Sequence, residues 1–325
     1  MFDRKGLPKS VTVYEVGPRD GLQNESLVLS TPQKAQLIRD LVDAGAPAIE
    51  VASFVRPDLV PALADGEELL AQLAPLLASN RMSALVPNQK GLDRALNAGV
   101  REIAVFASAT ESFAKANLNN SIAGSLEIFT PVIEQSRSAG LAVRGYISMC
   151  FGDPWEGDVA PKKVVDVAER LFADGITELS LGDTIGVATP GQVIDLLSEF
   201  DARGIARSLL AVHFHDTYGQ ALSNTLTALQ EGITTVDSSI AGLGGCPFAK
   251  SATGNLATED LVWQLHGLGI ATGIDFQKLL GVSRWLRDET GLVIRSKTAI
   301  ALMNSAKNSD SRESDNGKYQ RRVER

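Results

Sequence analysis

The chain of 325 residues contains little of what marks several special classes of protein. It has only two cysteines, Cys150 and Cys246, so no disulfide framework is expected. No apolar run approaches the roughly 20 residues of a membrane-spanning helix. The opening residues, MFDRKGLPKS, lack the apolar core of a secretory signal. These absences predict a reduced, cytoplasmic protein without a membrane partner.

Positive charge is also scarce. The chain carries 31 Lys and Arg against 39 Asp and Glu, a net charge of -8, and no long basic run precedes its last few residues. Broad binding of nucleic acid or of an anionic membrane needs a basic surface, so neither partner is expected. With 44% hydrophobic and 22% charged residues, the composition is that of an ordinary globular protein.

What the chain does contain is a repeat. In each of five copies a helical stretch ends at a glycine, and an apolar, β-branched stretch begins a few residues later. The glycines are Gly45, Gly99, Gly140, Gly175 and Gly232, and glycine just past a helix is the usual left-handed stop. With two weaker copies and a first strand that no helix precedes, the repeat predicts eight strands, near residues 11–17, 48–53, 82–86, 102–108, 142–149, 177–182, 208–214 and 235–241.

Segments with helical spacing separate these strands. One begins at Ser30-Thr31-Pro32, which suits a helix cap and first turn. Strands that alternate with helices imply a parallel sheet, and eight such units predict an α/β fold, a (β/α)8 TIM barrel. A doubly wound open sheet is the alternative, but it would carry a Gly-rich phosphate loop after its first strand, and GPRDGLQ is not one.

The end of the chain differs from the repeat. Helical stretches near 255–268 and 275–289 predict extra C-terminal helices that cap the barrel or make an interface. Residues 1–303 are therefore expected to form one catalytic domain. The polar, charged segment 304–325 cannot bury enough apolar surface to order itself, so a disordered tail is expected there.

Ionisable residues stand at the ends of these predicted strands, where barrels of this kind gather their catalytic groups. His213 and His215 end the seventh strand, and positions i and i+2 of a strand point to one face. Two converging imidazoles are either a pair of divalent-metal ligands or two hydrogen-bonded histidines at a strand end. Asp20 follows the first strand. In a closed barrel the first and the seventh strand both flank the eighth, so Asp20 can face the two histidines. Its carboxylate suits Mg²⁺ or Mn²⁺.

Four further residues have competing interpretations. Arg19 is either a fixed charge for an oxyanion or enolate near the metal, or half of a surface pair with Asp20. Glu50 and Asp183 lie in otherwise apolar strands, where an unpaired carboxylate is costly. Each is a partner of Arg19, a base or a member of a structural ion pair. Asn255 is either a helix cap or an oxygen ligand of the metal.

A glycine-rich segment, Gly242–Pro247, follows the eighth strand and carries Cys246. It is either a mobile rim loop whose thiol acts as acid or base, or a tight turn with an incidental cysteine. Cys150, at the end of the fifth strand, is predicted to be a buried hydrophobe. His266 lies in a predicted helix and is not expected to be catalytic.

Longer strings in the same order resemble the hydroxymethylglutaryl-CoA lyases over roughly residues 11–295. They are VYEVGPRDGLQNE (13–25), AIEVASFV (48–55), VRGYIS (143–148), ELSLGDTIGVATPG (178–191), HFHDTYGQALSN (213–224), VDSSIAGLGGCPFA (236–249) and TGNLATEDLV (253–262). The family belongs to the metal-dependent barrels that make or break bonds between an acyl enolate and a keto acid. Its condensing relatives carry RDGEQ where this chain has RDGLQNE.

The resemblance implies roles for individual residues. Asp20, His213, His215 and Asn255 match the metal-binding set. Arg19 matches the residue that steadies the enolate oxygen, Cys246 the catalytic loop cysteine, and Glu50 and Asp183 acidic site residues. The general base stays open among His213, Asp20 and Cys246. The expected cofactor is a divalent metal, Mg²⁺ or Mn²⁺, the expected partner an acyl-CoA, and the expected assembly a homo-oligomer, specifically a dimer.

The chain departs from the family pattern near the acyl and CoA ends. Asp58-Leu59 stands where a lysine-tryptophan pair is usual, Ser26 where a lysine is common, and Ser251 where a glycine is usual. The string around Asp153 also differs. The implied reaction is cleavage of 3-hydroxy-3-methylglutaryl-CoA to acetyl-CoA and acetoacetate. The alternatives are the same cleavage of citramalyl-CoA or a longer 3-substituted glutaryl-CoA, a condensing synthase, or an inactive barrel that only binds acyl-CoA.

Overall fold

The structure is a computed structural model that describes residues 6–245 and 254–309. Eight parallel strands close into a barrel in the order β1-β10-β9-β8-β5-β4-β3-β2. They are β1 (Thr12–Glu15), β2 (Ala48–Ser53), β3 (Arg81–Leu85), β4 (Glu102–Ser108), β5 (Ala142–Ser148), β8 (Glu178–Asp183), β9 (Leu210–Phe214) and β10 (Thr235–Ser238). The predicted (β/α)8 barrel is confirmed, and the doubly wound alternative is wrong because β1 pairs with both β10 and β2.

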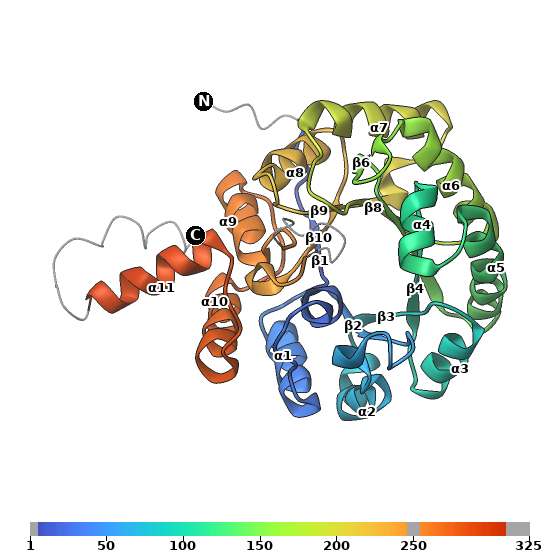
Figure 1. The fold of residues 1–325 in the computed structure, drawn as a ribbon. Helices are drawn as coiled ribbons and strands as arrows, with labels where there is room; N and C mark the ends of the chain where they lie inside the picture. Colours follow the sequence, from blue (N-terminus) through green and yellow to red (C-terminus); the bar gives the residue numbers. More distant parts are fainter. Residues whose placement is uncertain (1–5, 246–253, 310–325) are drawn as a thin grey trace.

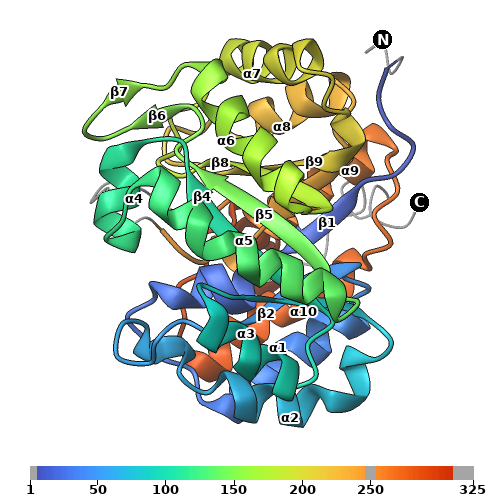
Figure 2. The same cartoon turned by 90° about the vertical axis from the view of Figure 1, so that its right-hand side faces the viewer.

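Helices surround the barrel on its outside (Figure 1). They are α1 (Thr31–Asp43), α2 (Gly66–Leu77), α3 (Gln89–Asn97), α4 (Glu111–Leu118), α5 (Ile122–Ser138), α6 (Pro161–Asp174), α7 (Pro190–Ala202), α8 (Ala221–Gln230), α9 (Thr258–Leu268), α10 (Phe276–Trp285) and α11 (Lys297–Ser309). In the side view of Figure 2, α5 and α6 lie over β5. Among the described helices, none combines the length and apolar character that a membrane span requires.

Short elements complete the description. Two π-helical turns are η1 (Gly17–Gly21) and η5 (Leu286–Thr290), and three 3-10 turns are η2 (Pro61–Leu63), η3 (Arg207–Leu209) and η4 (Ile240–Gly242). The two-residue strands β6 (Gly152–Asp153) and β7 (Gly157–Asp158) pair as a small hairpin.

The local signals that predicted the repeat are present in the structure. The five stop glycines all have positive φ, from 79° at Gly140 to 111° at Gly175. At Gly45 a side chain is also excluded by space, because a Cβ there would lie 2.3 Å from the carbonyl oxygen of Gly273. The Ser30 cap forms a capping box with Gln33 at the start of α1. The glycines end their helices a few residues before the next strand, and the capping box marks the residue at which α1 begins.

The core lies between the barrel wall and the helices. Helix α6 shows how a helix of the ring turns an apolar stripe toward the strands: its stripe is Val164, Val165, Val167, Ala168 and Leu171, all buried. Burial of such a side chain contributes about 1.5–3 kcal/mol. The C-terminal helices pack on one another through Leu280 of α10 and through Ala299 and Met303 of α11. In Figure 1, α11 lies outside the ring of helices, and it crosses the boundary expected at residue 304.

Candidate active site

The C-terminal ends of the barrel strands surround a cavity of about 670 Å³. Arg19, Asp20, His213 and His215 line one part of it. A second set of lining residues is apolar, and we call it the apolar wall: Val28, Val55, Leu59, Val60, Pro61 and Phe113. Among the described lining residues Arg19 is the one cationic side chain. The site therefore combines a charged, ligand-rich group of side chains with this apolar wall.

Arg19 and Asp20 reach the cavity because the chain turns sharply after β1. Residues 17–21 form the π-helical turn η1, whose backbone amides at Arg19, Asp20 and Gly21 all donate to the Val16 carbonyl. Gly17 permits this turn, since a Cβ there would lie 2.6 Å from Oε1 of Glu15. The turn sets the two side chains over the end of the barrel.

Asp20, His213 and His215 form a cluster that can hold a metal ion. One ligand atom of each lies within 4.8 Å of the others, and the two imidazole centroids are 5.3 Å apart. Neither histidine's Nδ1 has a hydrogen-bond partner among the described residues. The convergence of these three groups matches the metal-ligand alternative, and Nδ1 of His213 also lies 3.4 Å from Oδ2 of Asp237. Burial lowers the pKa of His215 to about 3, so its ring is neutral and able to bind a metal.

Asn255 adds an amide to this cluster. Its backbone forms a bridge with His215, and its Nδ2 donates to Oδ2 of Asp20 at 2.8 Å and to the Leu243 carbonyl at 3.0 Å. Its Oδ1 is buried without a partner among the described residues. Helix α9 begins only at Thr258, with Ala257 as its N-cap, so Asn255 does not cap it. A buried, unpaired amide oxygen beside a carboxylate and two imidazoles fits a divalent cation.

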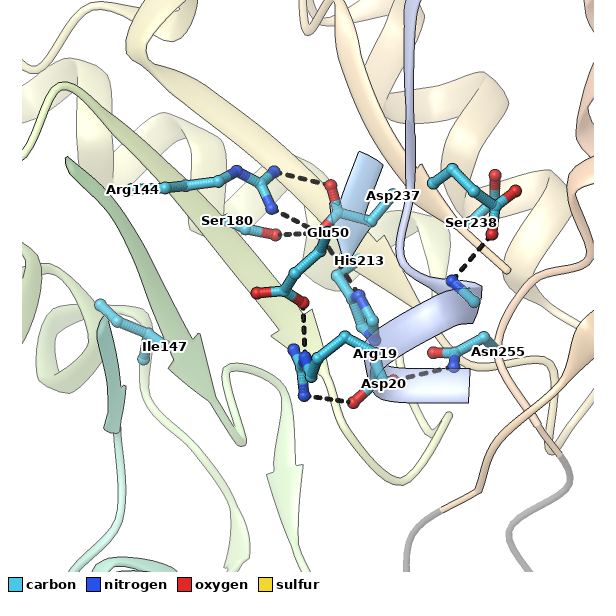
Figure 3. A network of polar contacts seen from close by, with 12 residues as sticks. Arg19, Asp20, Glu50, Arg144, Ile147, Ser180, His213, Asp237, Ser238 and Asn255 are labelled. Carbon is cyan, nitrogen blue, oxygen red and sulfur yellow. Dashed lines mark hydrogen bonds and ion pairs between the residues drawn. The ribbon is translucent and has the colours of Figure 1, made fainter. Parts of the chain in front are cut away.

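Arg19 is a buried member of the site and not half of a surface pair. It is 8% exposed, its Nε donates to Glu50 at 2.6 Å, and its Nη1 donates to Asp20 at 2.9 Å (Figure 3). Burial alone would lower the pKa of Arg19, but the carboxylates of Glu50 and Asp20 raise it. The residue therefore stays cationic. Among the described residues no hydrogen bond uses Nη2.

The two acidic candidates play different structural parts. Glu50 is fully buried, and burial raises its pKa against the lowering effect of Arg19. Of the alternatives predicted for it, partnership with Arg19 is the one its contacts match. Asp183 accepts from the backbone amides of Val187 at 2.9 Å and Ala188 at 3.2 Å. Burial raises its pKa to about 7 in spite of these bonds.

Sequence reasoning missed a buried polar network behind the cluster. Arg144 lies in β5 and has no exposed surface. Both of its Nη atoms donate hydrogen bonds to the carboxylate of Asp237 in β10, and the hydroxyl of Ser180 in β8 donates to the same carboxylate (Figure 3). Burial would raise the pKa of Asp237, but the Arg144 guanidinium lowers it to about 2. Glu50 was noticed because it is a charge inside an apolar strand. The same signal is present for Arg144 in AVRGYIS and for Asp237 in TVDS.

The remaining predicted residues lie in several places. Cys246 and Ser251 fall outside the described residues. The start of the predicted rim loop is fastened by Glu25, which accepts from the Gly244 amide at 3.1 Å. Cys150 is buried, and burial raises its pKa, as expected for a structural cysteine. His266 of α9 pairs with Thr272.

The positions that depart from the family pattern separate into two groups. Leu59 lines the cavity and is 66% exposed, beside an Arg56–Asp58 ion pair at the surface. Asp153 is buried instead in the turn between β6 and β7. It accepts from Thr110 Oγ1 at 2.6 Å and from two backbone amides. Leu59 can therefore contact a ligand in the cavity, whereas Asp153 organises a turn.

Comparisons with known proteins agree with this geometry. The HMGL-like family model matches residues 10–286. The mitochondrial hydroxymethylglutaryl-CoA lyase of Bos taurus is 50% identical over 295 residues, 91% of this chain and 90% of the relative. The cytoplasmic 3-hydroxy-3-methylglutaryl-CoA lyase of Mus musculus is 47% identical over 92% of this chain and 87% of its own length.

A solved structure, hydroxymethylglutaryl-CoA lyase from Pseudomonas aeruginosa, superimposes with a TM-score of 0.88 at 47% identity, over 92% of this chain and 99% of that one. Both the sequence match and the superposition extend over the whole barrel, including the strand ends that carry the cluster. The chain therefore belongs to the HMGL-like family.

Proposed function

We propose that this protein is a divalent-metal-dependent carbon–carbon lyase that cleaves 3-hydroxy-3-methylglutaryl-CoA into acetyl-CoA and acetoacetate. The observation that carries the proposal is the Asp20–His213–His215 cluster beside a buried, doubly held Arg19. The names of relatives close to 50% identical over most of the chain support the same reaction. An inactive acyl-CoA-binding barrel would not need a complete set of ligands and charges.

Asp20, His213, His215 and Asn255 would hold the metal, which we propose is Mg²⁺ or Mn²⁺. Their donor set is one carboxylate oxygen, two imidazole nitrogens and one amide oxygen, and the buried Oδ1 of Asn255 has no other partner among the described residues. When bound, such a cation supplies Lewis acidity toward the substrate oxygens. The protein's part is to hold these four side chains in place before substrate arrives.

Arg19 would stabilise the thioester enolate that forms as the carbon–carbon bond breaks. Glu50 and Asp20 fix two of its nitrogens, which leaves Nη2 available for the developing oxyanion. A donor that is already oriented costs no reorganisation at the moment of reaction, so it favours the transition state over the bound substrate.

The proton steps complete the cycle. The acceptor of the tertiary hydroxyl proton is one of Asp20, His213 and Cys246. We propose that Cys246 returns a proton to the enolate carbon, because a thiol exchanges its proton near neutral pH. The two carboxylate oxygens of Asp183 accept from backbone amides of the loop that follows β8. Asp183 would thereby hold this loop in place, including Thr184, which lines the cavity.

Acyl specificity, assembly and location belong to the same proposal. The apolar wall with Leu59 suits the methyl group of the substrate and also a longer 3-substituent. We propose a homodimer in the cytoplasm. The location stays a prediction, since the relatives include both mitochondrial and cytoplasmic proteins.

The test is a product assay on the purified protein with Mg²⁺ or Mn²⁺. We expect acetyl-CoA and acetoacetate in equal amounts from 3-hydroxy-3-methylglutaryl-CoA, and slower cleavage of citramalyl-CoA. Faster cleavage of a longer 3-substituted glutaryl-CoA would identify that compound as the substrate instead. Condensation of acetyl-CoA with a keto acid and no cleavage would indicate a synthase. Binding without turnover of any compound would contradict the enzymatic proposal.

A further inference from the structure

A carboxylate that does not line the cavity faces the rear of His213. Asp237 lies in β10 and is 1% exposed. Its Oδ2 is 3.4 Å from Nδ1 of His213 (Figure 3). That distance is an ion-pair contact beyond the usual hydrogen-bond length, and Nδ1 has no hydrogen-bond partner among the described residues. Asp237 is therefore the charged group that the rear nitrogen of His213 meets.

The carboxylate of Asp237 cannot turn away from this position. Arg144 donates through Nη2 to Oδ1 at 2.6 Å and through Nη1 to Oδ2 at 3.1 Å, and Ser180 donates to Oδ2 at 2.8 Å. These bonds fill three of the roughly four acceptor positions of a carboxylate. Oδ2, the oxygen that His213 meets at 3.4 Å, accepts two of these bonds, and the open position is on Oδ1.

Arg144 is itself immobile. Its Nε donates to Glu178 at 2.6 Å, and its guanidinium carbon lies 3.9 Å from the ring centroid of Tyr14 and 4.7 Å from that of Tyr146. A buried guanidinium held on this many sides keeps its partner ionised and fixed. The contacts of Asp237 are therefore determined from the barrel interior, independently of what occupies the cavity.

A fixed negative charge near Nδ1 decides which nitrogen of His213 carries the proton. A neutral imidazole has one N–H donor and one lone pair. A lone pair on Nδ1 would meet a carboxylate oxygen and be repelled, whereas a proton on Nδ1 is attracted. The lone pair is then on Nε2, which becomes available as the ligand atom that His213 contributes beside Asp20 and His215. His215 differs in that, among the described residues, no carboxylate makes an ion-pair contact with its buried Nδ1, whereas Asp237 makes one with Nδ1 of His213.

We propose that Asp237, clamped by Arg144 and Ser180, is a positioning residue that sets the tautomer of His213 and so prepares its Nε2 for the metal. The inference rests on the metal site of the proposed function. A carboxylate behind a metal-binding imidazole commonly contributes about 10–100-fold in metal affinity. Asp237 acts through His213 and is not expected to touch the substrate.

The first measurement uses the metal-free wild-type protein. Its three histidines are few enough to assign, with His213→Asn identifying one set of signals. Long-range ¹H–¹⁵N NMR of histidine-labelled protein at pH about 8.5, above the ordinary imidazole range, should show His213 protonated at Nδ1. A proton on Nε2 of His213 in this protein would overturn the proposal without any variant of Asp237.

The second measurement uses variants of the clamp. Asp237→Asn should shift the His213 tautomer and weaken Mn²⁺ binding, measured by calorimetry, by about 10–100-fold. Ser180→Ala keeps the charge and should weaken Mn²⁺ binding several-fold, which tests the clamp even where Asp237→Asn fails to fold. The matched control is Glu259→Gln, a buried carboxylate that accepts from Ser283 and from the Ala241 amide and, among the described residues, makes no bond to the clamp, which should leave the tautomer and Mn²⁺ affinity unchanged.

The outcomes separate this inference from the proposed function. Wild-type protein that binds no Mn²⁺ would contradict the metal site itself. If the wild-type protein binds Mn²⁺ and the Asp237→Asn variant keeps the same His213 tautomer and the same Mn²⁺ affinity, only the role of Asp237 is overturned. Unchanged affinity in Ser180→Ala would show that the clamp does not act on the metal site.

Discussion

The ion pair between Arg19 and Glu50 allows catalysis and stability to be measured separately. Arg19→Met removes the guanidinium and keeps an unbranched apolar side chain that ends near the position of Nε. We expect turnover to fall by about 10³-fold, equivalent to about 4 kcal/mol, which is the upper range for one lost oxyanion donor. The Michaelis constant should change little, because the enolate charge appears only as the bond breaks.

The same substitution should also destabilise the fold. Glu50 has no exposed surface, and its only hydrogen bond among the described residues is the 2.6 Å bond from Arg19 Nε. Breaking a buried ion pair from one side costs about 3–5 kcal/mol, because the other charge is left without a partner. The free energy of unfolding, measured with urea at neutral pH, should fall by an amount in this range.

The double variant Arg19→Met/Glu50→Gln separates the two effects. It removes the unpaired carboxylate, so it should recover much of the lost stability while turnover stays at the level of Arg19→Met. The assay is steady-state release of acetoacetate on protein first shown to be folded. Recovery of turnover in the double variant would refute a direct role of Arg19. Unchanged turnover with a raised Michaelis constant in the single variant would make Arg19 a substrate anchor.

Three further predictions concern the metal, the pH dependence of stability and the cysteines. His215→Ala and Asp20→Ala should each lose most Mn²⁺ affinity in calorimetry and most turnover while remaining folded by circular dichroism, and turnover that survives exhaustive chelation would contradict the metal mechanism. Burial raises the pKa of Glu259 from 4.5 to about 8, so the native protein keeps a proton that the unfolded chain releases. The free energy of unfolding should therefore fall as pH rises through that interval. Glu259→Gln should flatten this slope in urea titrations, and an equal slope in the variant would place the proton elsewhere. Iodoacetamide should label Cys246 faster than Cys150, which is 2% exposed, and substrate should protect Cys246. Mass spectrometry locates the label, and full turnover of protein alkylated at Cys246 would exclude its proton-transfer role.

The sequence by itself determined the fold to a large extent, because the signals for it are local. A glycine such as Gly175 ends a helix through its own backbone preference, and the strand that follows is recognised by a short run of β-branched residues. Five clear copies of this pattern, two weaker ones and a first strand leave few arrangements other than a closed barrel. The sequence also identified the three residues of the cluster that could hold a metal, because residues that end parallel strands meet at one rim.

Only the tertiary structure decided which partners the charged residues have. The sequence left three roles for Glu50, and the choice depended on Arg19, 31 positions away, meeting it at 2.6 Å. Asn255 is not the cap of α9, which begins at Thr258, and its amide instead meets Asp20, 235 positions away.

Asp237 and Arg144 were missed for the same physical reason. A charge buried in a strand is stable only if another strand brings its counter-charge, and these two lie 93 positions apart. Local sequence carries the preference of a segment for helix, strand or turn. Which ionised groups face one another inside the barrel is set by strand register, which appears only once the barrel is closed.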